Sequence, residues 1–198
     1  MRWDRFFEDL EDQLDSEWEA ERAALDSEAE RLRLSRVGLR ERLVALAAAS
    51  RVVTMHLSDG DVLAGAVARV GADWAAVFAD GGKSTAAVVP LWAVAGIGAA
   101  TDAVLGSVRD ARPGPALGQR MSFGFVLRDL VRRRVAVTVQ VVGGRTLNGT
   151  IDRAGADHLD LALHEPGSPR RVENVTGYRV VPFSAVVAVR VASVSELS

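Results

Sequence analysis

The chain has no cysteine and only one lysine, Lys83, among its 198 residues. Without cysteine it can form no disulfide bond, thiol nucleophile or zinc site of the finger type, and this fits a reducing compartment. No apolar run reaches the roughly 18 residues that a membrane-spanning helix requires, and the acidic start of the chain is unlike a signal peptide. We therefore expect a cytoplasmic protein with no membrane partner.

Charge is spread unevenly along the chain. The formal net charge is −2, so the protein as a whole is not a polycation made for nucleic acid. Residues 1–35 contain twelve Asp and Glu but only five Arg, whereas the rest of the chain carries a net charge of +5. The use of arginine for nearly every basic residue is more typical of a genome rich in G and C than of a binding site. The sequence thus predicts an acidic arm joined to a mildly basic body.

Residues 1–49 predict a long helical arm. Between residues 4 and 49 there is no proline and a single glycine, Gly38, near which we expect a break. Apolar residues recur at intervals of three, four and seven, the spacing of one helix face, although Glu21 interrupts that face. Such a helix cannot bury its stripe alone, so it must pack on the body, on a second copy or on a partner protein. The candidate contact residues of the arm are Trp3, Phe7, Leu10, Leu14, Trp18 and Leu25.

The body contains an internal repeat. Residues 52–77 match residues 136–161 at a constant offset of 84, with nine of 26 positions identical. A later block, 88–94, matches 180–186 at an offset of 92, so the second copy has eight extra residues between the two blocks. Self-similarity of this kind predicts that the two halves share one fold.

Each copy has the pattern of short β-strands after a helix. Apolar and polar residues alternate over 53–57 and 137–141, and Asp59-Gly60 and Gly143-Gly144 are tight-turn signals. Gly65 and Gly149 are expected to mark a bulge or bend inside the second strand, and Pro90 and Pro182 to begin a final short strand. The second helix is expected over 123–134, capped by Ser122.

Five bent strands within about 50 residues favour a small closed barrel, because closure removes exposed edges. We therefore predict an α+β protein, with a long N-terminal helical arm followed by two small β-barrels, each preceded by a helix. The expected segments are the arm 1–49, the first barrel 50–98, a linker 99–117, the second helix and barrel 118–192 and a tail 193–198.

The two copies resemble the Sm/LSm-like small barrels, which are SH3-like. The matching residues are Leu57, Gly60, Leu63, Gly65 and Asp73, then Val141, Gly144, Leu147, Gly149 and Asp157. The resemblance implies a barrel preceded by a helix, ring assembly through edge strands and binding of single-stranded RNA. The RNA pocket of that family uses an Asp-x-hydrophobic-Asn turn and an Arg-Gly pair. This chain keeps the aspartates, lacks the Asn, and has Val89-Pro90 and Val181-Pro182 in place of Arg-Gly.

Arginines form the one candidate nucleic-acid site. They are Arg120, Arg128, Arg132, Arg133, Arg134, Arg153, Arg170 and Arg171. Arginines can grip phosphates with salt-dependent affinity. The same cluster can equally be a solvated helix end or a dock for the acidic arm, within or between chains. Trp74 and Trp92 can stack on a base, but strand tryptophans more often lie in a core or a subunit interface.

No residues predict catalysis. The chain has no nucleophile elbow, HExxH motif or Walker lysine. His158 and His164 would be about 20 Å apart on one strand, too far to share a metal. The leading hypothesis is a non-enzymatic scaffold or interaction module that self-associates or binds another protein through the arm. The alternative is an RNA- or DNA-binding regulator that uses the Arg-rich helix 120–134 and the barrel loops, and a third, weaker class is an accessory domain of an enzyme. No metal, cofactor or small-molecule substrate is implied.

Overall fold

The structure, a computed structural model, describes residues 2–79, 85–109 and 117–191. The side chains of residues 2–12, and with them the predicted contacts Trp3, Phe7 and Leu10, lie outside the described residues. The fold is α+β, and the chain divides into two compact units, Met1–Gly38 and Leu39–Ser198. Within the described ranges, no helix is both long enough and apolar enough to cross a membrane.

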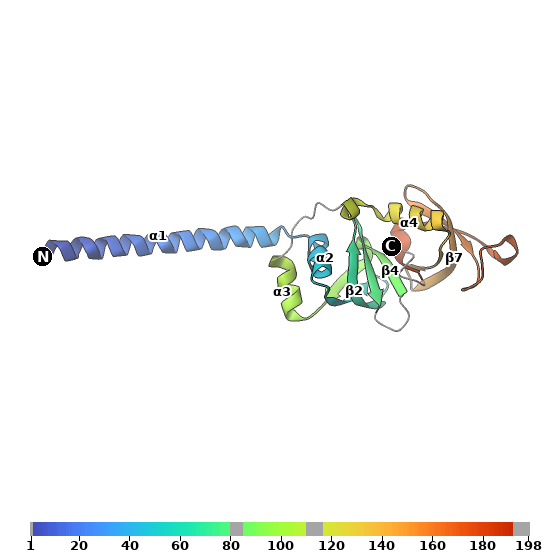
Figure 1. The fold of residues 1–198 in the computed structure, drawn as a ribbon, viewed down its shortest axis with the longest axis horizontal. Helices are drawn as coiled ribbons and strands as arrows, with labels where there is room; N and C mark the ends of the chain where they lie inside the picture. Colours follow the sequence, from blue (N-terminus) through green and yellow to red (C-terminus); the bar gives the residue numbers. More distant parts are fainter. Residues whose placement is uncertain (1, 80–84, 110–116, 192–198) are drawn as a thin grey trace. The chain divides into compact units, whose positions relative to one another are not determined.

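The first unit is a single helix, α1 (Arg2–Ser35), followed by a short turn (Figure 1). The helix ends three residues before Gly38, near the break that the sequence predicts. Exposed ion pairs run along its surface, from Arg31 to Glu28 at 3.2 Å and from Arg33 to Glu30 at 2.7 Å. Pairs of this spacing weakly stabilise an exposed helix.

The second unit combines helices with one antiparallel sheet. Its helices are α2 (Leu39–Ala48), α3 (Thr101–Arg109) and α4 (Phe123–Arg133). Its strands are β1 (Val52–Leu57), β2 (Val62–Val70), β3 (Trp74–Ala79), β4 (Thr85–Pro90), β5 (Val94–Gly98), β6 (Ala136–Val141), β7 (Arg145–Ala154), β8 (His158–Leu163), β9 (Gly177–Pro182) and β10 (Val186–Val191). The ten strands are ordered β5-β1-β2-β3-β4-β10-β6-β7-β8-β9.

The predicted repeat is confirmed in the backbone. Helix α2 and helix α4 begin at positions 84 residues apart, and strands β1 to β5 correspond in order to β6 to β10. The backbone after each helix is also equivalent, because Ser50 (φ 49°) and Arg134 (φ 54°), 84 residues apart, both adopt the left-handed conformation. Ser122 caps α4 as expected, its hydroxyl accepting from the Phe125 N–H at 3.3 Å. Each copy is therefore a helix followed by five strands in the order 5-1-2-3-4.

The prediction of two closed barrels is wrong, because the strands form one continuous open sheet. Closing the first copy would require β4 to pair with β5. Strand β4 pairs instead with β10 of the second copy, and β5 lies at the far end of the sheet beside β1. The edge that closure was expected to remove is thus covered by the other copy.

One smaller expectation fails, and a second is met only in part, because the predicted bulge lies in the second strand but not at its glycine. Pro90 and Pro182 are the last residues of β4 and β9, each followed by a 3₁₀ turn, rather than the first residues of a strand. The bulge in the second strand lies after Gly149, between Ile151 and Arg153. Gly149 has a different role, because a Cβ there would lie 2.1 Å from the Ala162 carbonyl oxygen. The glycine allows two strands to approach closely.

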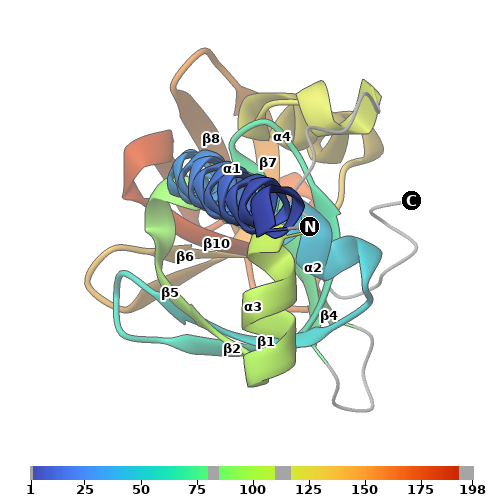
Figure 2. The ribbon, with the colours of Figure 1, turned by 90° about the vertical axis from the view of Figure 1, so that its left-hand side faces the viewer.

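Residues 99–117, the expected linker, include helix α3. This helix lies beside α2, where the Arg42 guanidinium donates to the Ser107 hydroxyl at 3.0 Å and to the Val104 carbonyl at 3.0 Å (Figures 1 and 2). Helices α2 and α4 pack on β2 and β7 through buried leucines, Leu43 and Leu127 among them. The two copies thus have equivalent helix–sheet cores.

Candidate interaction surfaces

The first candidate surface is the joint between the two copies. Strand β4 pairs antiparallel with β10, with Val88 opposite Val189 and Ala86 opposite Val191. These residues are all buried. The hydrophobic cores cross this joint, since Val187 and Ala188 of β10 pack with the first copy while Val88 packs with the second. The joint therefore has the character of a domain core and not of a sliding contact.

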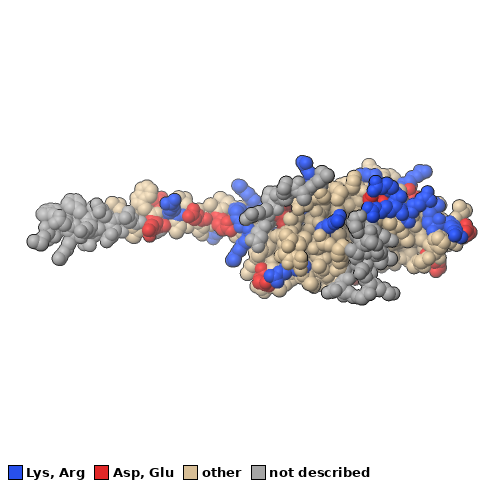
Figure 3. Space-filling view, viewed as in Figure 1, with Lys and Arg blue, Asp and Glu red and all other residues tan. Residues whose placement is uncertain are grey.

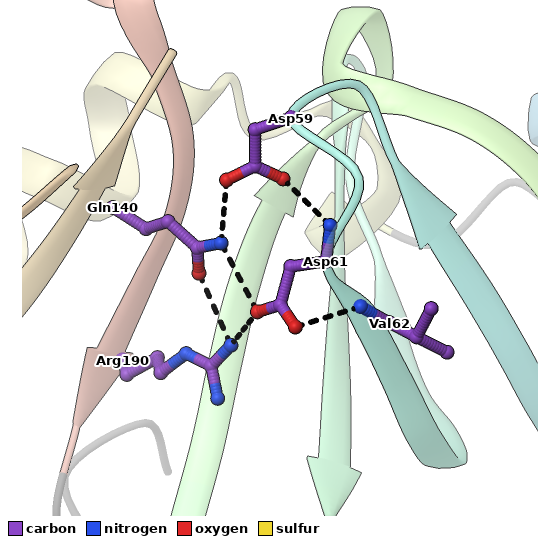
Figure 4. Close-up of polar contacts among 5 residues, drawn as sticks. All are labelled: Asp59, Asp61, Val62, Gln140 and Arg190. Atoms are coloured by element: carbon purple, nitrogen blue, oxygen red, sulfur yellow. Dashed lines mark hydrogen bonds and ion pairs between the residues drawn. The ribbon is translucent and has the colours of Figure 1, made fainter. Parts of the chain in front are cut away.

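A polar network fastens one rim of the joint (Figure 4). The Gln140 side-chain amide donates to Asp59 at 2.7 Å and to Asp61 at 3.0 Å. The Arg190 guanidinium donates to Asp61 at 2.6 Å and to the Gln140 carbonyl oxygen at 3.1 Å. A hydrogen bond from the Val62 backbone N–H lowers the pKa of Asp61, and Gln140 and Arg190 lower it further. The turn of the first copy is thereby tied to two strands of the second.

Both candidate tryptophans also contribute to this joint. Trp74 is buried, and its indole N–H donates to the Met121 carbonyl at 2.9 Å. Trp92 lies edge-on to Phe123, the first residue of α4, with ring centroids 5.5 Å apart. The Phe123 backbone N–H in turn donates to the Asp73 carboxylate at 2.6 Å. These tryptophans hold the second copy against the first.

The second candidate surface consists of the two ends of the sheet. Strands β9 and β5 each have one neighbouring strand within the described part of the chain. On β9, Tyr178 and Val180 are 61% and 64% exposed and Arg179 is also exposed. By the offset of 92, these three residues correspond to Ala86, Ala87 and Val88 of β4. An edge that is buried inside the chain thus has an exposed equivalent at the end of the sheet.

The arginines of the predicted nucleic-acid site are partly neutralised. Arg132 and Arg133 both form ion pairs with Asp129, Arg133 at 2.9 Å. Arg170 forms a bidentate pair with Asp152, which raises the pKa of the arginine, and Arg171 lies 3.9 Å from Glu173. Arg128 donates to the Gly155 carbonyl at 3.3 Å. Arg120, Arg134 and Arg153 are exposed.

Basic side chains still gather over the α4 end of the second unit, while acidic ones line the described part of α1 (Figure 3). The site residues named from the sequence therefore fall into separate groups. Arg132, Arg133 and Arg134 lie together at the end of α4, whereas Arg170 and Arg171 lie in the loop after β8. Of the arm, Leu14, Trp18 and Leu25 are exposed.

The histidines make no metal site in the described ranges, where no three His, Asp or Glu side chains are close enough to share an ion. His158 contacts the neighbouring Asp157 at 2.8 Å. His164 is buried, with one ring nitrogen 2.9 Å from the Thr150 hydroxyl and the other 3.0 Å from the Glu165 carbonyl. Both nitrogens are thus used inside the fold.

Sequence reasoning missed the polar network of Figure 4. A signal for it was present in the repeat, because Asp59 and Asp61 correspond to Gly143 and Arg145 of the second copy. Acidic residues that appear in one copy only mark a place where the copies have different neighbours. No known protein-family model matches the chain, and comparison with curated proteins gives no match either.

Proposed function

We propose that this protein is a non-enzymatic scaffold that self-associates head to tail, with β9 of one molecule pairing with β5 of the next. The observation that carries the proposal is the β4–β10 pairing within the chain. Strands β4 and β10 are the repeat equivalents of β9 and β5. The chain already makes this contact once, through β4 and β10. The equivalent strands, β9 and β5, lie at opposite ends of its sheet.

The repeat offsets supply a register for the contact between molecules. Inside the chain, Ala87 pairs with Arg190 and Val88 with Val189. The repeat offset of 92 converts each β4 residue to its β9 equivalent and each β10 residue to its β5 equivalent. Arg179 therefore lies opposite Gly98 of the next molecule, and Val180 opposite Ile97. Both β5 and β10 have a bulge at the corresponding place in their pairing with the first strand of their own copy, β1 and β6 respectively. The two edges therefore have matching backbones.

The edge of β5 has little of the protection that monomeric proteins give to an exposed strand. Edge strands are usually blunted by charged residues, proline, bulges or short length, and β5, although short and bulged, contains no charged residue and no proline in its sequence Val-Ala-Gly-Ile-Gly. A contact between two different edges is heterologous, so it propagates into a ring or a filament. We propose on the same grounds that the chain is a tandem Sm-like protein, since each copy places its strands in the order 5-1-2-3-4 after a helix.

Light scattering coupled to size-exclusion chromatography tests the proposal. We expect the full chain to form an oligomer that persists in high salt, with a protein-like 260/280 nm absorbance ratio. The variant Val180→Asp places a charge on the β9 edge and should lower the molecular mass of the oligomer, because it removes the edge pairing. Val172→Asp is the matched control, because Val172 is 85% exposed but lies outside the edge strand. A monomeric wild-type protein would overturn the proposal, and a nucleic-acid absorbance ratio that falls with salt would favour the RNA- or DNA-binding alternative.

Cross-linking tests the register. The chain has no cysteine, so introduced thiols report only on the chosen pair. Mixing Arg179→Cys with a differently tagged Gly98→Cys protein should give a disulfide-linked heterodimer. A Cβ at Gly98 meets only ordinary contacts, 3.7 Å from Thr54 atoms, so that variant should fold. Mixing Arg179→Cys with Ala95→Cys, three residues along β5, should give several-fold less product.

A further inference from the structure

An elongated apolar groove crosses the second unit from α2 to α4. It consists of two adjoining hollows of about 380 Å³ and 210 Å³. Arg69, Trp74 and Met121 line both hollows and so mark the middle of the groove. Ala48 lies at the α2 end, and Phe125, an aromatic residue that is 51% exposed, lies at the α4 end.

Arginines give this groove a positive rim. Arg69, at the middle, is exposed, and Arg133 lines the α4 end beside its ion-pair partner Asp129. Arg132 and Arg134 flank Arg133 in the sequence at the end of α4. An occupant therefore needs an apolar face flanked by negative charge.

Helix α1 has such a face. Leu14, Trp18 and Leu25 are exposed, Trp18 by 73%. At roughly 100° per residue these three positions lie within about 40° of one another around the helix. Glu21 lies on the same face, and residues 1–35 carry a net charge of −7. The helix thus offers apolar side chains and carboxylates side by side, whereas the groove offers apolar walls and guanidinium groups.

We infer that the groove of one molecule binds helix α1 of a second copy, with Trp18 and Leu25 against its apolar walls and Glu21 toward Arg69. Pairing of two α1 helices in register is the less favourable alternative. In such a pair Glu21 would face its own counterpart in the seam, where a coiled coil requires apolar residues and like charges are destabilising. In the groove, Glu21 meets the positive charge of Arg69 in place of a second Glu21.

This contact is separate from the strand edges of the proposed function, because it uses the face of β2 and β3 and not an end of the sheet. The two can therefore fail independently. Val180→Asp should abolish edge pairing and leave the α1–groove contact intact, whereas Arg69→Glu should do the reverse.

Thiol cross-linking between full-length chains tests the inference. Leu25→Cys is mixed with a differently tagged Ala48→Cys protein, and both proteins also carry Val180→Asp so that edge pairing makes no contribution. We expect a disulfide-linked heterodimer. The matched control is Ala23→Cys, an exposed position about 180° around the helix from Leu14, which should give at least fivefold less product.

Charge reversal makes the test specific. Adding Arg69→Glu to the Ala48→Cys protein should reduce the yield several-fold, and adding Glu21→Arg to the Leu25→Cys protein should restore it. A Leu25→Cys homodimer as the main product would overturn the inference in favour of paired α1 helices. Efficient cross-linking within a dilute Leu25→Cys/Ala48→Cys double variant would overturn it in favour of docking within one chain. Absence of any disulfide above the Ala23→Cys control would overturn it altogether.

Discussion

The inner edges of this sheet, β4 and β10, differ from their repeat equivalents at its ends, β9 and β5. Val88 of β4 is fully buried, whereas the equivalent Val180 of β9 is 64% exposed. The strands have the same order, the same partners and the same bulges within each copy. The difference in burial therefore comes from the neighbour that each edge has and not from the strand itself. An edge becomes core when a second copy covers it.

The residues of the two edges have diverged accordingly. Around Val88 the joint contains Trp74, Ala76 and Ala86, all buried. The corresponding residues in the second copy are His158, Asp160 and Tyr178. A wholly apolar surface is typical of a permanent contact, whereas a surface that mixes polar and apolar groups also suits the separated state. The inner joint is obligatory, and the outer edge has the composition of a contact that can open.

The most disruptive test of this comparison is Val88→Asp against Val180→Asp. A carboxylate at position 88 would be buried without a partner, so we expect the free energy of unfolding to fall by at least about 3 kcal/mol, a large share of the roughly 5–15 kcal/mol of a typical domain. The same change at position 180 meets solvent and should alter monomer stability by less than about 0.5 kcal/mol. Urea denaturation at low protein concentration measures both. Equal losses in the two variants would show that β9 is covered within its own chain.

A second comparison concerns the glycines before each third strand. A Cβ at Gly71 would lie 2.1 Å from the Trp74 indole nitrogen and 2.6 Å from the Met121 carbonyl, both held in the joint. At the equivalent Gly155 it would lie 2.8 Å from the exposed ring of His158, which can move aside. We expect Gly71→Ala to cost about 2–3 kcal/mol and Gly155→Ala less than about 1 kcal/mol.

Thermal unfolding of the two alanine variants checks this second prediction. A serine at position 155 serves as a further control, because it too should be tolerated. Similar melting temperatures for Gly71→Ala and Gly155→Ala would mean that Trp74 does not fix the joint.

Much of this architecture could be predicted from the sequence, and the part that could not has a physical cause. Helix α4 and the turns at Gly60 and Gly144 follow from local signals, namely the Ser122 cap and the positive φ that glycine allows. The repeat indicated equivalent copies. The local sequence does not distinguish a β4 that pairs with β5 from a β4 that pairs with β10, because both arrangements satisfy the backbone hydrogen bonds of β4. That choice depends on side chains such as Trp74 and Phe123, which are far apart in sequence.

The polar network at the joint predicts a pH dependence. The pKa of Asp61 is lowered in the folded protein, chiefly by the Val62 backbone N–H and then by Gln140 and Arg190. Its contribution to stability is therefore complete above the ordinary carboxyl value of 3.8 and is lost as the pH falls through the lowered pKa. Asp61→Asn should cost about 1 kcal/mol or less at pH 7, since solvent screens this half-exposed group, and nothing once Asp61 is protonated.

Urea denaturation of wild type and Asp61→Asn from pH 7 to pH 2 measures that difference. Arg145→Ala, at the equivalent position of the second copy, should show no such change with pH. If the difference in free energy of unfolding between wild type and Asp61→Asn grew toward low pH, the pKa of Asp61 would not be lowered in the folded protein.

The smallest expected effect comes from a substitution that makes the proposed β9–β5 contact between molecules more like the β4–β10 contact within the chain. In the proposed head-to-tail register, Arg145 takes the place of Asp61, and His56 of the next molecule takes the place of Gln140. Arg145→Asp would restore an acid to this turn, opposite an imidazole that can donate a hydrogen bond. We expect the dissociation constant of the oligomer to fall about two- to threefold, which corresponds to about 0.5 kcal/mol, with monomer stability unchanged. Sedimentation velocity measures this change, and Arg145→Ala separates the loss of a positive charge from the gain of an acid. Only the proposed register predicts that Arg145→Asp associates more tightly than Arg145→Ala and that His56→Ala abolishes this difference.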